Sequence, residues 1–374
     1  MFAEAFRNQT VWLSGHTGFK GAWLAQWLLE LGADVHGFAL KPATKPALFE
    51  QLGLAGKLHH QIADIRDPAA VRKSIEKSQP DFVFHLAAQP LVRLSYEQPL
   101  ATYATNVMGT AHVLEALRGL KKPCAAVLVT TDKCYENREW LHGYREDDPL
   151  GGHDPYSSSK AAAEIAIAAW RRSFFKNHPV KIASARAGNV IGGGDWANDR
   201  IVPDCIRALQ KKQPIAVRNP NSTRPWQHVL EPLSGYLWLA ARLSQPLAAP
   251  KRSKGGSTFN PQLSTAFNFG PTHDANRTVR ELVAEVLKHW PGRWEDRSDP
   301  KAVHEAGLLQ LSTDKARALL GWAPVWSFTT AVKHTVSWYR ETTADPRSAS
   351  ALAVQQIGQY QADAAPAGLS WAAR

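Results

Sequence analysis

The feature that most constrains the fold is a glycine-rich turn between a short apolar run and a longer helical one. Gly15, Gly18 and Gly21 directly follow the run Val11–Ser14 and open the segment Phe19–Leu31. Glycines at this spacing let the backbone turn tightly and approach a pyrophosphate, which then lies at the helix N-terminus. A tight strand-to-helix turn would use the same residues, but the strand before it and the helix after it favour a dinucleotide site.

The first half of the chain continues this alternation. Short β-branched runs predict buried strands, and longer amphipathic runs predict the helices between them. The predicted strands are Val11–Ser14, Asp34–Ala39, Phe82–Ala87, Ala126–Thr130 and Lys181–Ala185. The predicted helices are Phe19–Leu31, Pro68–Ser78 (with Asp67 as N-cap), Pro99–Leu120 and Tyr156–Phe175. The pattern is typical of a doubly wound, Rossmann-type α/β fold with a parallel sheet.

The pattern loosens after about residue 188, where Gly, Pro, Asn and Trp are frequent and helices such as 201–210, 233–243 and 279–288 are isolated. We therefore predict a Rossmann-type nucleotide-binding domain over residues 1–187, with returns near 225–245 and 265–271. A smaller mixed domain over 188–345 would bind the substrate. Lys251–Ser257 is a predicted surface loop, and the Ala- and Gln-rich residues 346–374 are a weakly specified tail.

Charge and cysteine content disfavour several other classes of protein. The net charge is +11, but the basic residues are scattered, so nucleic acid is not an expected partner. Three irregularly spaced cysteines suit neither a disulfide framework nor a zinc site, so we expect no metal and a cytoplasmic location. The N-terminus lacks the apolar region of a signal peptide, and no run approaches the roughly 20 apolar residues that cross a membrane.

Further residues at predicted strand ends are candidates for cofactor contacts. Asp64 and Ile65 follow a short apolar piece, where the acid could accept from an adenine amino group, although a solvated loop explains Asp64 equally well. Ala87, Ala88 and Gln89 close another strand with small residues, as a backbone passing close to a cofactor needs. The contacts predicted within the glycine-rich turn are Gly15, Thr17, Gly18, Phe19, Lys20 and Gly21.

A tyrosine and a lysine four residues apart are the first catalytic candidates. Tyr156 and Lys160 share one face of a helix, and a nearby ammonium favours the phenolate of a group whose ordinary pKa is about 10. Such a pair is usually only surface packing. Its position after a buried strand, preceded by Thr131, favours a base that takes a proton from a hydroxyl group.

The chain carries the motif Gly15-x-x-Gly18-x-x-Gly21 and, later in the sequence, Tyr156-x-x-x-Lys160. With both motifs it resembles the extended short-chain dehydrogenase/reductase family. The resemblance implies that Asn106 organises the catalytic hydrogen bonds. Within the family, the segment 130–137 (TTDKCYEN) looks like the sugar-nucleotide 4,6-dehydratases, and Asp132-Lys133 looks like their CDP-glucose branch. The stretches 151–156, 186–196 and 224–228 are similar to that branch too, and the resemblance covers roughly residues 8 to 342.

The resemblance implies CDP-glucose as substrate, NAD as cofactor, and a homodimer formed through helices 102–120 and 161–175. Tyr156 would take the proton of the sugar 4-hydroxyl while hydride leaves carbon 4, and Thr131 would hold that oxygen. Asp132 would be the acid that expels the 6-hydroxyl, provided that burial raises its pKa. Lys133 would act either as a deprotonated base or by polarising a water or the enolate; a plain salt bridge between Asp132 and Lys133 is the alternative.

Arginines after residue 188 are candidates for gripping the substrate diphosphate, because a guanidinium binds phosphate oxygens in pairs. Arg224 is the first choice and Arg218 a second, unless their segment is only a solvated loop. Asn189 and His228 would contact the same region. The cytosine preference rests on the resemblance, since no residue pattern recognises a base.

The end of the second predicted strand bears on the choice of cofactor. It lacks the acidic residue that usually holds an NAD ribose, and Lys41 could favour a 2′-phosphate. NAD is still expected, because a hydride returned within one turnover needs no exchange with a NADPH pool. Two other functions stay open: a nucleotide-sugar 4-epimerase, which needs neither Asp132 nor Lys133, and a nucleotide-binding regulator without turnover.

Overall fold

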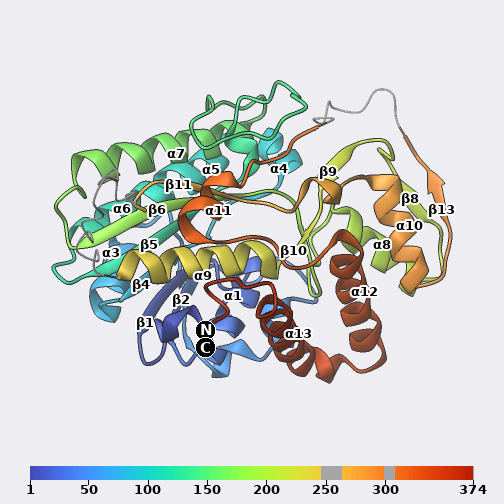
Figure 1. The fold of residues 1–374 in the computed structure, drawn as a ribbon, viewed down its shortest axis with the longest axis horizontal. Coiled ribbons are helices and arrows are strands. Elements are labelled where there is room, and N and C mark those ends of the chain that lie inside the picture. The colour runs from blue at the N-terminus through green and yellow to red at the C-terminus, as the bar shows by residue number, and fades with distance from the viewer. Residues whose placement is uncertain (246–262, 299–307, 374) are drawn as a thin grey trace, which may run out of the picture.

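The computed structural model describes residues 1–245, 263–298 and 308–373, so the predicted loop Lys251–Ser257 lies outside the described residues. At its centre is a seven-stranded sheet with the order β11-β6-β5-β4-β1-β2-β3, in which every neighbouring pair is parallel (Figure 1). The strands are β1 (Thr10–Ser14), β2 (Asp34–Ala39), β3 (His59–Ile62), β4 (Phe82–His85), β5 (Cys124–Val129), β6 (Val180–Ala187) and β11 (Ala266–Phe269). The predicted doubly wound α/β fold is confirmed.

Both faces of the sheet are buried, because successive side chains of a strand point to opposite sides. Trp12 of β1 packs in one cluster with residues of the helices on its side, α3 (Pro68–Ser78), α6 (Gly109–Arg118) and α7 (Pro155–Ser173). Val11 and Leu13 belong to the opposite cluster, which includes residues of α1 (Phe19–Glu30) and α9 (Leu230–Ser244). The sheet therefore forms the middle of three layers.

The strand order reverses at β1, which pairs with β2 on one side and with β4 on the other. In open α/β sheets, ligands bind at the carboxyl ends of the strands beside such a switch point. Here those ends are Ser14 of β1 and His85 of β4, and they are joined by a hydrogen bond of 2.7 Å between Ser14 Oγ and His85 Nδ1. The topology thus brings the glycine-rich turn beside Ala87.

Two elements of the first half differ from the prediction. The helix predicted over 99–120 is divided into α5 (Pro99–Tyr103), the π-helical turn η3 (Ala104–Met108) and α6. β3 (His59–Ile62) was not among the predicted strands, because three of its four side chains are polar and most are exposed at the edge of the sheet. The remaining short helices here are η1 (Phe2–Glu4), α2 (Leu48–Gln51), η2 (Leu54–Gly56), α4 (Val92–Glu97) and η4 (Asp132–Cys134).

The residues after β6 build most of a second, mixed region at one end of the molecule, on the right of Figure 1. Its helices are α8 (Ile201–Gln210), α10 (Val279–His289) and α12 (Phe328–Ala344), and its short strands are β7 (Val190–Ile191), β8 (Ile215–Val217), β9 (Thr223–Pro225), β10 (Gln227–His228), β12 (Asn276–Thr278) and β13 (Trp294–Asp296). η5 (His273–Ala275) and α11 (Asp314–Leu320) connect elements of this half. α9 and β11 return to the first region, because α9 packs on the sheet and β11 pairs with β6.

The C-terminal residues fold, in contrast to the weakly specified tail that their composition predicted. After η6 (Pro346–Ser348), α13 (Ala349–Ala364) packs against α1 and α12. Trp371 is fully buried and stacks on Phe2 with ring centroids 5.1 Å apart, so the two termini lie side by side (Figure 1). Among the described residues, none of the helices combines the length and apolar character needed to span a membrane.

Candidate active site

The glycine-rich turn has the geometry of a close approach between backbone segments. Gly15 has a φ of +77°, and a Cβ at this position would lie 2.7 Å from the backbone nitrogen of Ala87. A Cβ at Gly21 would lie 2.1 Å from the carbonyl oxygen of Gly15. Gly18 is the N-cap of α1 and supplies no side-chain cap, so the first N–H groups of this helix can receive an anion.

The other side chains of the turn have defined partners. Thr17 Oγ1 donates to the Leu40 carbonyl oxygen at 2.8 Å, which fixes the turn against the end of β2. Phe19 borders Gly192, where an added Cβ would lie 3.2 Å from its ring. Burial lowers the pKa of Lys20 to about 8, with Arg200 acting in the same direction. Lys20 Nζ lies 3.5 Å from the hydroxyl of the buried Tyr236, so the ammonium points into the protein.

Asp64 and Ile65 follow β3. Both carboxylate oxygens of Asp64 accept from the Arg66 guanidinium, the shortest contact being 2.6 Å, and this hydrogen-bonded pair lowers the pKa of the Asp64 carboxyl. Ile65 is buried against Gly109, and its carbonyl oxygen lies 3.0 Å from His112 Nδ1. Any adenine contact made by Asp64 would thus be shared with Arg66.

The π-helical turn η3 positions Asn106 beneath the carboxyl end of β4. Its Oδ1 accepts from the Gln89 backbone N–H at 2.8 Å, and its Nδ2 donates to the Gln89 carbonyl oxygen at 3.1 Å and to Ser159 Oγ at 2.9 Å. Ser159 donates in turn to the Tyr156 carbonyl oxygen at 2.7 Å. Asn106 therefore ties the segment around Ala88 and Gln89 to the first turn of α7. A π turn at a functional site is a recurring feature of helices.

Tyr156 and Lys160 lie on one buried face of α7, whose N-cap Asp154 accepts from the Ser157 backbone N–H at 2.9 Å. Burial raises the pKa of Tyr156 to about 12, partly offset by a hydrogen bond with Thr131. Burial also lowers the pKa of Lys160 to about 8, and its ammonium donates to the Val129 carbonyl oxygen at 3.4 Å. In this conformation the pair does not favour the phenolate, because burial dominates both groups.

Asp132 is held on the turn that follows β5. Thr131 caps this turn, accepting from the Lys133 backbone N–H at 3.3 Å, and its hydroxyl donates to Asp132 Oδ1 at 2.9 Å. Asp132 Oδ2 is buried, and no donor within the described residues reaches it. A Cβ at Gly188 would lie 2.7 Å from this oxygen. Burial raises the pKa of Asp132, against the opposing charges of Lys133 and Arg224, which favours a carboxyl that still carries its proton.

The predicted substrate contacts fall into two groups. Arg224 on β9 donates to the Thr223 carbonyl oxygen at 2.8 Å and acts electrostatically on Asp132, and the half-buried Asn189 lies between β6 and β7. Arg218 is half-exposed and paired with Asp199 at 2.8 Å. The structure therefore places Arg224 and Asn189 close to Asp132, whereas Arg218 is engaged in an ion pair elsewhere.

His228 does not lie where a substrate contact would require it. Its side chain is fully buried, and its ring packs edge-on against Trp23 and Trp326 at centroid distances of 6.0 and 4.8 Å. No substrate atom can reach a side chain without exposed surface in this conformation. The structure thus gives His228 a place in the core, and its contact with the substrate stays a prediction.

Two residues near the site were missed by sequence reasoning. Arg200, directly before α8, pairs with Asp195 at 2.8 Å and acts electrostatically on Tyr156. Tyr236 of α9 is buried within electrostatic reach of Asp132 and Tyr156, and its hydroxyl lies 3.5 Å from Lys20 Nζ. The Gly-rich stretch before Asp195 could have drawn attention to Arg200, whereas nothing in the sequence singled out Tyr236.

Comparisons with known proteins agree with this geometry. Residues 13–335 match the family described as GDP-mannose 4,6 dehydratase. A CDP-glucose 4,6-dehydratase of Salmonella typhimurium is 47% identical over 344 residues, covering 90% of this chain and 91% of that protein. A GDP-mannose 4,6-dehydratase of Sordaria araneosa is 27% identical, covering 89% of this chain and 61% of that protein.

The fold is shared with solved structures at lower sequence identity. A dTDP-glucose 4,6-dehydratase of Bacillus anthracis in complex with NAD has a TM-score of 0.71 and 18% identity, covering 90% of this chain and 98% of that one. A UDP-glucose 4-epimerase of Thermotoga maritima with UDP-glucose has a TM-score of 0.73 and 21% identity, covering 89% and 99%. Dehydratases and epimerases therefore share this fold, and the fold alone does not separate them.

Proposed function

Because this chain belongs to the GDP-mannose 4,6 dehydratase family, as the resemblance of its motifs predicted, we propose that it removes water from CDP-glucose in an NAD-dependent reaction. The product is CDP-4-dehydro-6-deoxyglucose. The observation that carries this proposal is the buried Asp132 carboxyl, which is placed beside Thr131 and keeps one oxygen without a donor among the described residues. An oxidation at carbon 4 alone would need no such acid.

The carboxyl ends of β1 and β4 fit a nicotinamide dinucleotide. The uncapped start of α1 would receive the pyrophosphate, and Gly15, Gly18 and Gly21 leave room for the backbone to approach it. The remaining contacts would come from Thr17, Phe19, Lys20, Asp64, Ile65, Ala87, Ala88, Gln89, Tyr156 and Lys160. The bound nicotinamide would accept the hydride of carbon 4 and return it to carbon 6, and its positive ring would favour the phenolate of Tyr156.

Tyr156 takes the proton of the sugar 4-hydroxyl in the first half of the reaction, and the Thr131 hydroxyl turns from Asp132 Oδ1 to donate to the same oxygen. Burial alone opposes ionisation of this phenol, since it raises the pKa to about 12. Lys160, one helical turn further along α7, stabilises the phenolate when its ammonium leaves the Val129 carbonyl oxygen. Asn106 hydrogen-bonds both Gln89 and Ser159 of α7, and so holds these two segments in fixed positions for this transfer.

Asp132 donates its proton to the departing 6-hydroxyl in the second half. The ketone at carbon 4 acidifies the proton on carbon 5, so removal of that proton and protonation of the 6-hydroxyl together expel water. Lys133 lies on the same turn as Asp132. It serves either as the neutral base that takes the carbon 5 proton, or as the cation that stabilises the enolate and polarises a water that takes this proton. The same proton returns to carbon 5 when the hydride is delivered to carbon 6.

Arg224 and Asn189 are the proposed contacts of the substrate diphosphate and sugar, since both lie on segments that border Asp132 and β6. Arg218 remains a weaker candidate, because binding a phosphate would cost its ion pair with Asp199. Arg200 is better placed for an anionic group than Arg218, as it acts electrostatically on Tyr156 itself.

A mass-resolved assay tests the proposed activity. The purified chain is incubated with NAD and CDP-glucose, and in parallel with UDP-, GDP- and dTDP-glucose. We expect loss of one water from CDP-glucose and little or none from the other three. A product of unchanged mass would instead indicate a 4-epimerase, and conversion of none of the four would favour a binding protein without turnover.

We also propose a homodimer in which α5, η3 and α7 face the same helices of a second copy. Leu100, Met108 and Ile165 are 85%, 52% and 58% exposed on these adjacent helices. Apolar side chains gathered on neighbouring helices favour burial against a partner. Light scattering at micromolar concentration should give twice the chain mass, and Ile165→Glu should lower it; a monomeric wild-type chain would contradict the proposal.

A cytoplasmic location completes the proposal. Cys124, Cys134 and Cys205 are all free and buried. Free thiols suit a reducing compartment such as the cytoplasm.

A further inference from the structure

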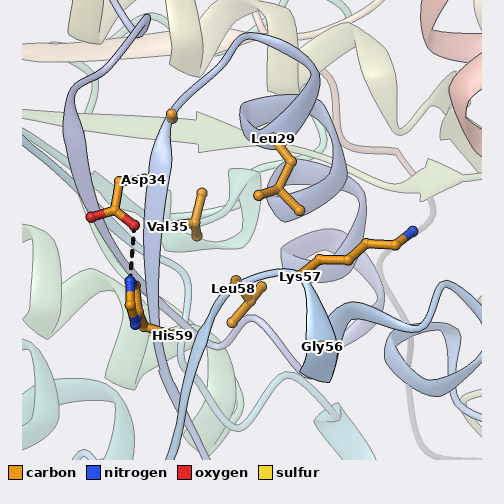
Figure 2. Close-up of a pocket in the computed structure, with 8 residues that line it drawn as sticks. Leu29, Asp34, Val35, Gly56, Lys57, Leu58 and His59 are labelled. Carbon is orange, nitrogen blue, oxygen red and sulfur yellow. Dashed lines mark ion pairs between the residues drawn. The ribbon is translucent and has the colours of Figure 1, made fainter.

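Three potential metal ligands gather at the amino ends of β2 and β3, at the opposite end of these strands from the glycine-rich turn. Asp34 and His36 are two residues apart on β2, so their side chains lie on the same face of the sheet. His36 is the register partner of His59 on β3, which places the two imidazoles side by side. Figure 2 shows Asp34 and His59 pointing toward each other beside Val35 and Leu58.

The distances within this group are close to those of a metal site. His59 Nε2 lies 3.1 Å from Asp34 Oδ1, and His36 Nε2 lies 3.1 Å from Asp34 Oδ2. The two imidazole rings are stacked with centroids 4.3 Å apart, and the ligand atoms of all three residues lie within 4.8 Å of one another. Ligand atoms of a tetrahedral zinc ion are roughly 3.4 Å apart, since each bond is about 2.1 Å. The lone pair of an imidazole nitrogen lies in its ring plane, so two stacked rings cannot both face one ion, and binding requires rotation of the 67% exposed His59 side chain.

We propose that Asp34, His36 and His59 bind one divalent transition-metal ion, with Zn²⁺ as the best fit. Two imidazole nitrogens and one carboxylate suit ions of borderline softness, whereas Ca²⁺ and Mg²⁺ require mainly oxygen ligands. Water completes the coordination, because the side chains of Asp34 and His59 are 50% and 67% exposed. Within the described parts of the chain, no other three His, Cys, Asp or Glu side chains come this close together.

The ion would act on stability and not on the reaction. β3 is the edge strand of the sheet and is held to the remaining strands by its pairing with β2. A metal ligated by residues of both strands adds a cross-link at their amino ends, whereas the proposed catalytic residues lie on η3, on α7 and on the turn that follows β5. An ion that binds only the folded chain raises the apparent stability by mass action.

Direct binding measurements test the site. The full-length chain is stripped with a chelator, dialysed and titrated with Zn²⁺ alone, with Co²⁺ as a spectroscopic probe of nitrogen ligation. We expect one saturable ion per chain and at least about a tenfold loss of affinity in His59→Gln, since even the loss of a group that only orients a ligand has this effect. The matched control is His273→Gln, an exposed histidine on η5, which should bind as the wild type does.

Thermal unfolding provides a second measurement. Zn²⁺ should raise the Tm of the wild type and of His273→Gln in a concentration-dependent way, and should leave the Tm of His59→Gln unchanged. If His59→Gln folds poorly, Asp34→Asn replaces it, because the amide still accepts a hydrogen bond but is a much weaker ligand. Equal zinc affinity in the wild type and the ligand variants, or no saturable binding in the wild type, overturns the proposal. The group would then be only a pair of histidine–aspartate hydrogen bonds.

Discussion

At the scale of single residues, the surroundings of the Asp132 carboxyl and of the Tyr156 phenol suit the two groups to different roles in proton transfer. Asp132 shares its turn with Thr131 and is buried, which raises its pKa and favours the protonated carboxyl, while burial raises the pKa of Tyr156 and a nearby positive charge is needed to offset it. One group can therefore give a proton and the other take one at the same pH. This division of roles predicts that the two halves of the reaction can be blocked separately.

Replacing Asp132 by Asn should block dehydration and leave oxidation at carbon 4. An amide cannot supply the proton, so we expect net water loss to fall by more than about a hundredfold. Reduced nicotinamide should still form with CDP-glucose, as followed by its absorbance. Tyr156→Phe should abolish both signals, and Glu295→Gln, at an exposed ion pair with Arg297, should change neither. Unimpaired water loss by Asp132→Asn would refute its role as the acid.

His85 should make stability depend on pH. It is fully buried between Ser14 and Thr110, and burial lowers its pKa to about 3, so it folds as the neutral imidazole. Between this value and the ordinary histidine pKa of about 6.5, the unfolded chain binds more protons. The stability that neutral His85 contributes is therefore complete above pH ~6.5 and is lost as the pH falls toward 3.

Denaturant unfolding at a series of pH values measures this effect. The free energy of unfolding should decrease below pH ~6.5 with a contribution from His85 approaching about 1.4 kcal/mol per pH unit. His85→Gln should be less stable at neutral pH but show a shallower pH dependence, while the exposed His142→Gln keeps the wild-type slope. An unchanged slope in His85→Gln would show that another group titrates.

At the scale of elements, η3 and α13 are the two that differ most from what the sequence predicted. The π turn η3 inserts one wide turn between α5 and α6, and thereby points Asn106 at Gln89 and Ser159. α13 differs, because Ala and Gln favour a helix by themselves, and Tyr360 and Trp371 hold this segment against the rest of the molecule. Packing therefore decides where α13 lies and does not oppose the local preference of its residues.

The docking of the C-terminal segment predicts a large stability effect far from the active site. Trp371 is fully buried, stacked on Phe2 and Tyr360, and its carbonyl oxygen accepts from the Phe2 N–H at 2.7 Å. Trp371→Ala should lower the free energy of unfolding by about 3–5 kcal/mol, as for other large buried aromatics. Gln355→Ala, on the exposed face of α13, should have little effect in the same urea titration. Equal values for the two variants would mean that the segment does not contribute to the core.

At the scale of the whole molecule, one sheet carries the proposed nucleotide site at the carboxyl ends of its strands and the proposed metal site at the amino ends of β2 and β3. Residues from α7, β5, β9 and α9 approach the same region, although they are far apart in the sequence. Communication between the two ends is not required by either proposal. Cofactor binding should therefore stabilise the chain independently of zinc.

At the same scale, we predict that the chain retains NAD only in part. The segment after β2 ends in the exposed Lys41 and offers no acid for an NAD ribose, so NAD should be held incompletely. Enzyme freed of nucleotide should lose most of its activity and regain it on addition of NAD, with a matching rise in Tm. Full activity after removal of nucleotide, with none added, would contradict this expectation.

The sequence by itself determined the order of strands and helices, the glycine-rich turn and the Tyr156–Lys160 pair, because periodicity, turns and four-residue spacing are local properties of the chain. It also led to the family. Only the tertiary structure decided what meets across long separations: Lys20 with Tyr236, His36 with His59, and the burial of His228 among tryptophans. Such contacts follow from strand register and from the packing of helices on the sheet. Neither is encoded within any single segment.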